Sequence, residues 1–145
     1  MEPRAVVEVM GGSAAVHASV RGLADLREEI ARGLRLAALH NTAEHIFPDP
    51  AARKRFLYRV VPEGSYKRRL KTGQLTPAES ERTARVAHIA ALADYVWEDP
   101  EAARAFLTTP HPELGDRPPI EVAVDEFGAR HVEEILHGIL HGLPA

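Results

Sequence analysis

The chain has 145 residues, of which 45% are hydrophobic and 27% charged, a composition typical of a soluble globular protein with one domain or two very small ones. It contains no cysteine, which excludes disulfides and thiolate metal sites and fits a reducing cytoplasm. No apolar run approaches the length of a membrane span, and the N-terminal sequence MEPRAVVEVMGG lacks the apolar core of a signal peptide, so we expect a cytoplasmic protein without a membrane partner.

The net charge of −3 hides a polarised chain. Residues 53–71 carry eight basic side chains and one acidic side chain, a balance of +7, whereas residues 98–145 carry three basic and ten acidic side chains, a balance of −7. This polarity suggests that the middle of the chain binds a polyanion and that the C-terminal part binds a more basic or apolar partner. The alternative is that the charges only cover solvated helices.

Helical patterns dominate the first half of the chain. Leucine and isoleucine recur every three or four positions in LADLREEIARGL (residues 23–34), which predicts an amphipathic helix that Gly33 interrupts. The segment LAALHNTAEHIF (36–47) resumes the helical pattern up to Pro48. The earlier segment RAVVEVM (4–10) fits either a short strand or a helix.

Two short helices are predicted next, at residues 49–61 and 65–71. Asp49 and Pro50 open the first helix as an N-cap followed by proline at the first helical position, and a tight turn at 62–64 separates the two helices. This length and punctuation are those of a helix-turn-helix unit, whose second helix enters the major groove of DNA. The competing interpretation is a degenerate unit that serves only as scaffold.

The second of these helices, SYKRRLK, offers the hydrogen-bond donors that a recognition helix needs. Arginine can bond guanine at two positions, and lysine neutralises backbone phosphates. Leu70 is expected to face inward, while basic side chains of the preceding helix suit contacts with the DNA backbone. The predicted DNA-binding residues are Ser65, Tyr66, Lys67, Arg68, Arg69, Lys71 and Arg55.

The clearest helix start in the chain is TPAE, residues 76–79, which reads as a capping box with proline at the first helical position. It opens a long helix whose inner side includes Trp97, best interpreted as a core residue with an indole N–H in need of a partner. Residues 99–107 repeat the Asp-Pro start, and residues 111–123 read as a loop with one helical turn after Pro119.

The last helix is predicted over residues 125–142, with Gly142 as its stop. No strong period-2 pattern appears elsewhere, so we predict an all-α fold. The apolar residues of this last helix fall on one stripe, which consists of Val132, Ile135, Leu136 and Ile139.

Three stretches resemble one known family. They are SYKRR followed by LTPAESER (residues 75–82), DPEAARAFLTTPHPELG (99–115) and GARHVEEILHGILHGLPA (128–145), and their order is that of the MbcA/ParS/Xre antitoxins. The earlier stretches VMGGSAAV and ARGLRLAALHNTAEHI also look like the N-terminal part of longer members, so the resemblance covers nearly the whole chain. The departures are Arg35, Phe106 and Asp116, where many relatives have proline, tryptophan and glycine.

The resemblance implies an Xre-like helix-turn-helix bundle at residues 21–75, after an N-terminal segment 1–20, and a small helical toxin-binding domain at 76–145. Antitoxins of this family pair with RES-domain toxins, which consume NAD and in some cases transfer ADP-ribose to a protein. The antitoxin's C-terminal segment blocks the toxin's NAD site, and its helix-turn-helix represses the module's own promoter. The implied protein is not an enzyme and needs no cofactor. Because helix-turn-helix proteins usually address paired half-sites, a homodimer is also expected.

The acidic C-terminal region has a physical reason to bind such a toxin, because a site that holds the phosphates of NAD should be basic. We expect the last three residues and their terminal carboxylate to enter or overhang that site. The alternative is that the apolar stripe of the last helix belongs to the chain's own core and that the tail frays. The predicted toxin-binding residues are Arg130, Glu133, Glu134, His137, Leu140, His141, Gly142, Leu143, Pro144 and Ala145.

His137 and His141 stand four residues apart, which is metal-ligand spacing on one helix face. The motif HGILH lacks the glutamate that a zinc protease has after its first histidine, and the chain has no glycine-rich phosphate loop. We therefore interpret both histidines as polar residues near a helix end and predict no metal site and no catalytic residue. The alternative functions are a stand-alone helix-turn-helix regulator with a C-terminal protein- or ligand-binding domain, and a histidine-based metal protein.

Overall fold

A computed structural model describes residues 2–16 and 19–142, and these ranges contain helices but no strand, which confirms the predicted all-α fold. The initial segment 4–10, which fitted either a strand or a helix, lies mostly in a helix. The α-helices are α1 (Pro3–Val9), α2 (Leu23–Arg32), α3 (Leu36–Ile46), α4 (Pro50–Val60), α5 (Glu63–Thr72), α6 (Pro77–Trp97), α7 (Pro100–Thr108), α8 (Pro119–Val122) and α9 (Glu126–Leu140), and the short 3-10 turns are η1 (Gly12–Ala14) and η2 (Pro112–Leu114).

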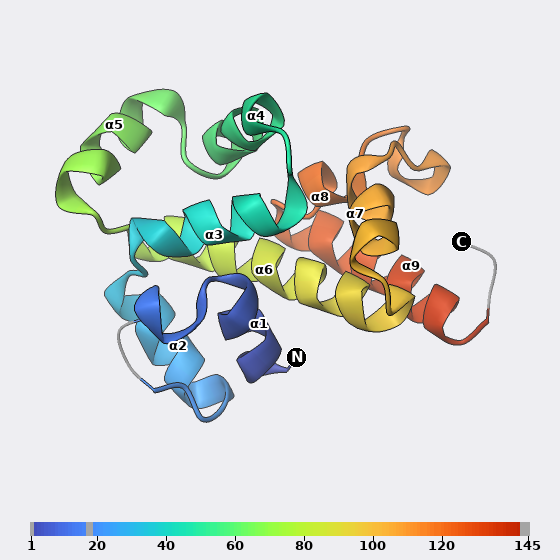
Figure 1. Ribbon diagram of the computed structural model, residues 1–145, viewed down its shortest axis with the longest axis horizontal. Helices are drawn as coiled ribbons and strands as arrows, with labels where there is room; N and C mark the ends of the chain where they lie inside the picture. The colour runs from blue at the N-terminus through green and yellow to red at the C-terminus, as the bar shows by residue number, and fades with distance from the viewer. Residues whose placement is uncertain (1, 17–18, 143–145) are drawn as a thin grey trace.

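The long helix α6 runs through the middle of the molecule, and helices from both halves of the chain pack against it (Figure 1). α9 and α7 contact it most extensively, and α1, α2 and α3 pack against it from the N-terminal half. With neighbours on several sides, α6 lacks the narrow apolar stripe of a surface helix. The domain boundary expected at residues 75 and 76 stays a prediction, since α6 is shared by both halves.

The start of α6 ties the helix-turn-helix region to the rest of the core. The predicted capping box is present: the Thr76 hydroxyl accepts from the Glu79 N–H at 3.2 Å, and the Glu79 carboxylate accepts from the Thr76 N–H at 2.9 Å. One residue further, the buried Ser80 hydroxyl accepts from the Leu34 N–H at 2.7 Å. The segment LTPAESER therefore fixes a helix start and also anchors the turn before α3.

The turn between α2 and α3 is built around Gly33. Its φ is +97°, in the region that favours glycine, and a Cβ at this position would lie 2.4 Å from the Leu75 carbonyl oxygen. The close approach is held by a hydrogen bond from the Leu75 N–H to the Leu34 carbonyl at 2.8 Å. The helix interruption predicted at Gly33 is therefore also a crossing point of two backbone segments.

The apolar stripe of α9 belongs to the core. Val132, Ile135 and Leu136 are buried, and Ile139 packs partly buried against them. The neighbour across this contact is α6. Of the two interpretations offered for the stripe, the one that assigned it to the chain's own core is confirmed, so a partner of α9 must use the opposite face of that helix.

Two of the residues that depart from the family pattern, Phe106 and Asp116, can be described by their local structure. Phe106 packs beside Trp97, with ring centroids 5.9 Å apart, and the Trp97 indole N–H is buried without a hydrogen-bond partner in the described part of the chain. Asp116 has φ +58° directly after Gly115 at +65°. Glycine favours this left-handed conformation, and aspartate is among the few other residues that tolerate it.

Candidate functional site

α4 and α5 are two successive short helices, as the sequence predicted, and α5 lies at one end of the molecule, away from α7 and α9 (Figure 1). The turn predicted at residues 62–64 is wrong in its bounds: α5 begins at Glu63, because Pro62 occupies its N-cap position, so only Val61 and Pro62 separate the two helices. Asp49 caps α4 by accepting from the Ala52 N–H at 3.0 Å, and Gly73 ends α5 with φ +71°. No residue of α5 is buried. Most of its surface is therefore open to a partner, while polar contacts hold it against the body.

The first of these contacts is made by Tyr66. Its hydroxyl shares a hydrogen bond of 2.7 Å with His40 Nε2 on α3, and its ring meets the Tyr58 ring edge to face. Burial, together with the nearby Tyr58, raises the pKa of Tyr66, and burial also lowers the pKa of His40. Both shifts favour the neutral form of each group, which suits the hydrogen bond between α3 and α5.

The second contact is an ion pair between Arg69 and Glu79. Arg69 Nε donates to one carboxylate oxygen at 2.6 Å and Nη2 donates to the other at 3.0 Å, and the side chains are only 16% and 6% exposed. Leu70, which we expected to face inward, is 56% exposed. That expectation is wrong, because α5 is oriented by Tyr66 and Arg69 at i and i+3 and not by an apolar residue.

The remaining predicted DNA-binding side chains of α5 lie on its outer side. Lys67, Arg68 and Lys71 are exposed, and Arg68 Nη2 donates to the Ser65 hydroxyl at 3.1 Å. Arg55 is exposed too, but it lines a different site, a groove of 460 Å³ between α4, α7 and α8. The structure thus brings four of the seven predicted DNA-binding residues together on the accessible side of α5.

The outer face of α9 carries the described part of the predicted toxin-binding set. Arg130, Glu134, His137, Leu140 and His141 are all exposed. Arg130, Glu134, His137 and His141 follow one another at helical spacing on the side opposite the buried stripe. Leu140, four residues after the buried Leu136, lies beside that stripe. Gly142 ends the segment with φ +78°, and Leu143, Pro144 and Ala145 lie outside the described residues.

Glu133 faces sideways, into a pocket of 530 Å³ between α1, α6 and α9. Its carboxylate accepts from His88 Nε2 at 3.2 Å. Burial lowers the pKa of His88, and the charge of Glu133 partly offsets that decrease. The pocket is lined by Glu2, Ala5, His88, Ala91, Leu92, Tyr95, Glu133 and His137.

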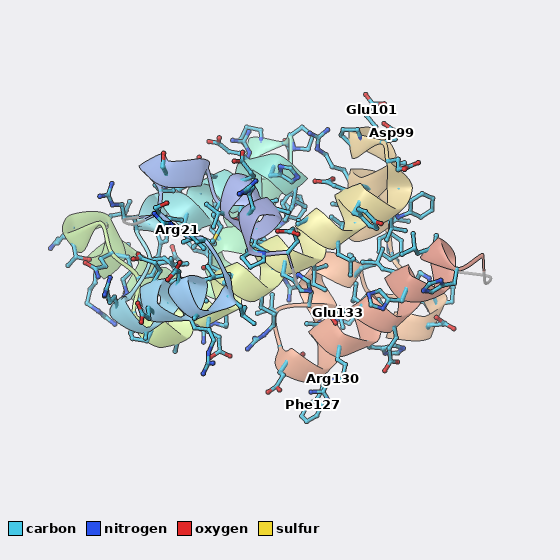
Figure 2. The ribbon with its side chains drawn as sticks, turned by 90° about the horizontal axis from the view of Figure 1, so that it is seen from below. Arg21, Asp99, Glu101, Phe127, Arg130 and Glu133 are labelled. Atoms are coloured by element: carbon cyan, nitrogen blue, oxygen red, sulfur yellow. The ribbon has the colours of Figure 1, made fainter. Side chains whose placement is uncertain are left out.

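One exposed residue of α9 was missed by the sequence analysis. Phe127 is 77% exposed and projects from the start of the helix beside Arg130 (Figure 2). The signal was present, because Phe127 precedes Arg130 by three positions and Glu134 by seven, which places all three on one face. Large aromatic residues of helices are usually buried, so its residue type gave no reason to expect an exposed Phe127.

Within residues 2–16 and 19–142, no three histidine, aspartate or glutamate side chains are grouped as metal ligands would be. None of the helices described there is long and apolar enough to cross a membrane.

Comparison with known proteins matches two successive parts of the chain. Residues 25–88 match the antitoxin Xre-like helix-turn-helix domain, and residues 92–142 match the antitoxin Xre/MbcA/ParS C-terminal toxin-binding domain. The protein named Antitoxin Xre from Pseudomonas putida is 32% identical over 84 residues, which cover 57% of this chain and 53% of that protein, so the match spans about half the length of this curated relative. With both domains present in order, the chain belongs to the Xre/MbcA/ParS antitoxin family, a family of binding proteins and not of enzymes.

Proposed function

We propose that the chain neutralises a RES-domain toxin by covering its NAD site with α9 and the tail that follows, and that it represses its own operon through α5. The single observation that carries the proposal is the match of residues 92–142 to a toxin-binding domain. α9 ends that stretch, and its apolar stripe is used internally. Its outer face is therefore the surface left for the toxin.

Charge supports this assignment. Residues 98–145 carry a balance of −7, and Glu133 and Glu134 lie on or beside the outer face of α9. A toxin site that binds the phosphates of NAD is basic, so the two surfaces attract each other and the approach is steered by charge. In this proposal α9 positions residues 142–145 over the NAD site, and the tail excludes the substrate.

The DNA-binding part of the proposal uses the outer side of α5. Lys67, Arg68 and Lys71 are exposed on a helix that has no fully buried residue. In this proposal Arg69 does not contact base edges, because its Nε and Nη2 both donate hydrogen bonds to the Glu79 carboxylate. A homodimer places two copies of α5 on paired half-sites about 34–36 Å apart, or a multiple of that distance.

The experiment is co-expression of the chain with the product of the adjacent gene, which the proposal predicts to be a RES-domain toxin, scored by growth and by the cellular NAD level. The full chain should restore growth. A chain that lacks residues 142–145 should bind the toxin but fail to block NAD consumption. A variant with Lys67, Arg68 and Lys71 replaced by alanine serves as the control, since it should lose operator binding and keep neutralisation. Growth that the full chain does not restore would refute toxin neutralisation, and inhibition that survives the truncation would exclude the tail as the plug.

A further inference from the structure

Phe127 is the most exposed large hydrophobic side chain in the described part of the chain. Neither packing in the core nor the proposed contacts of the tail explain why an aromatic ring is exposed here. Single exposed apolar residues are common and need no special explanation. The side chains and backbone around Phe127 set it apart, because they hold it in a fixed direction and place an arginine against it.

The start of α9 is held on several sides. A Cβ on Gly128 would lie 1.9 Å from the Val122 carbonyl oxygen, so only glycine lets α9 approach the end of α8 this closely. Asp125 accepts from the Gly128 N–H at 2.6 Å, and Arg85 of α6 donates to the Val124 carbonyl at 2.6 Å. The backbone beneath Phe127 is therefore fixed before any partner arrives, which lowers the entropy lost on binding.

Arg130 lies one turn further along, with its guanidinium carbon 5.8 Å from the centre of the Phe127 ring. Glu126 holds the same guanidinium at 3.5 Å from its carboxylate. Figure 2 shows both side chains projecting away from the body of the molecule. Aromatic residues and arginine are the types that dominate binding energy at protein interfaces, above all where they sit together on a rigid element.

Phe127 also shares a face with the proposed toxin contacts. The positions 127, 130, 134, 137 and 141 follow one side of α9, and the first and last are about 21 Å apart at 1.5 Å per residue. An interface of ordinary size, about 800 Å² on each partner, spans that distance. The region matched by the toxin-binding domain also contains both ends.

Resting on the proposed function, we propose that Phe127 is the apolar anchor of the toxin interface. It inserts into an apolar pocket on the toxin, with Arg130 at the rim, while the other end of α9 carries the tail to the NAD site. A buried aromatic ring removes about 150–250 Å² from water, which makes Phe127 the largest single apolar contribution from this face. Binding strength and the blocking of NAD then reside at opposite ends of one helix.

The test is the affinity of the full chain for its purified cognate toxin, measured by calorimetry for Phe127→Ala, Phe127→Leu and the control Leu23→Ala. Leu23 is 49% exposed on α2, outside the toxin-binding match, so its replacement should leave Kd within threefold. Phe127→Ala should raise Kd about 30-fold or more, as truncation of an interface hot spot does. Phe127→Leu should recover much of that loss. Thermal unfolding of the free variants should match the wild type, because the ring is exposed.

Two outcomes would overturn the proposal. In the first, Phe127→Ala binds the toxin as the wild type does. In the second, sedimentation shows that Phe127→Ala changes the oligomeric state of the free chain while toxin affinity stays the same, which assigns the residue to contact with a second copy. Failure of the proposed function looks different, because the wild-type chain itself would then not bind the toxin.

Discussion

Arg69 and Lys67 lie two positions apart on α5 but have different surroundings. Lys67 is exposed, whereas Arg69 is fixed between its helix and the start of α6 by both oxygens of Glu79. From the sequence alone, both residues are predicted to be cations of a recognition helix. Within the described residues, only Arg69 has a carboxylate partner, Glu79, which lies ten positions away on α6. The sequence explains Glu79 as one half of a capping box.

The Arg69–Glu79 pair predicts a pH dependence of stability. Burial alone would raise the pKa of Glu79, but hydrogen bonds from Arg69 and Thr76 and the charge of Arg69 lower it below the ordinary value. A carboxyl group whose pKa is lower in the folded state stabilises the protein above its unfolded pKa of about 4.3, and this stability is lost as the pH falls through the folded value. The melting temperature of the wild type should therefore fall more steeply with decreasing pH below about pH 4.3 than the melting temperature of Glu79→Gln.

Glutamine keeps the capping box, so Glu79→Gln removes only the charge and one of the two hydrogen bonds from Arg69. Glu81→Gln is the matched control on the same helix: its side chain is 65% exposed and its pair with Arg85 is screened by solvent, so the acid slope should stay that of the wild type. Equal slopes for the wild type and Glu79→Gln would mean that the pair does not stabilise the fold.

At the scale of helices, the sequence predicted where helices begin, but it did not decide which side of a helix is buried. Asp49, Thr76, Asp99 and Asp125 all cap helices with their side chains, because capping is a local interaction within four residues of sequence. The stripe on α9 is equally regular, yet its period is the same whether it packs on α6 or on another protein. Only the fold shows that it is internal. The exposure of Leu70 on α5 and of Phe127 on α9 depends in the same way on distant neighbours.

The outer side of α5 predicts the salt dependence of operator binding. Each phosphate contact contributes about 0.9 to the slope of log affinity against log salt concentration. The single variants Lys67→Ala, Arg68→Ala and Lys71→Ala should each weaken binding to the promoter of the operon and reduce that slope by up to about 1, measured by fluorescence anisotropy. The control is Arg27→Ala, an exposed arginine on α2, which should keep the wild-type slope. If all three α5 variants also keep it, α5 does not contact DNA.

Considered as a whole, the molecule has two proposed binding surfaces, at α5 and at α9, and one core. α6 belongs to both family matches, since the first ends within it at residue 88 and the second begins within it at residue 92. Further links cross between the halves. Arg59 on α4 pairs with Glu121 on α8, Arg104 Nε donates to the His45 carbonyl at 2.9 Å, and α3 contacts α7 directly. Such sharing predicts that the halves unfold as one cooperative unit, although the family matches describe them as two domains.

Cooperativity can be tested by hydrogen exchange with and without the toxin. A ligand at 100 times its Kd stabilises the folded state by about 2.7 kcal/mol, which slows exchange through global unfolding about 100-fold. In a single unit, this protection must reach the buried amides of α3 around Leu39, far from the toxin, as well as those of α9. Amides of α5 exchange through local opening, since that helix buries no residue, and should change little. Protection confined to α7–α9 would instead show that the two halves unfold independently, and the links through Arg59 and Arg104 would then carry no coupling.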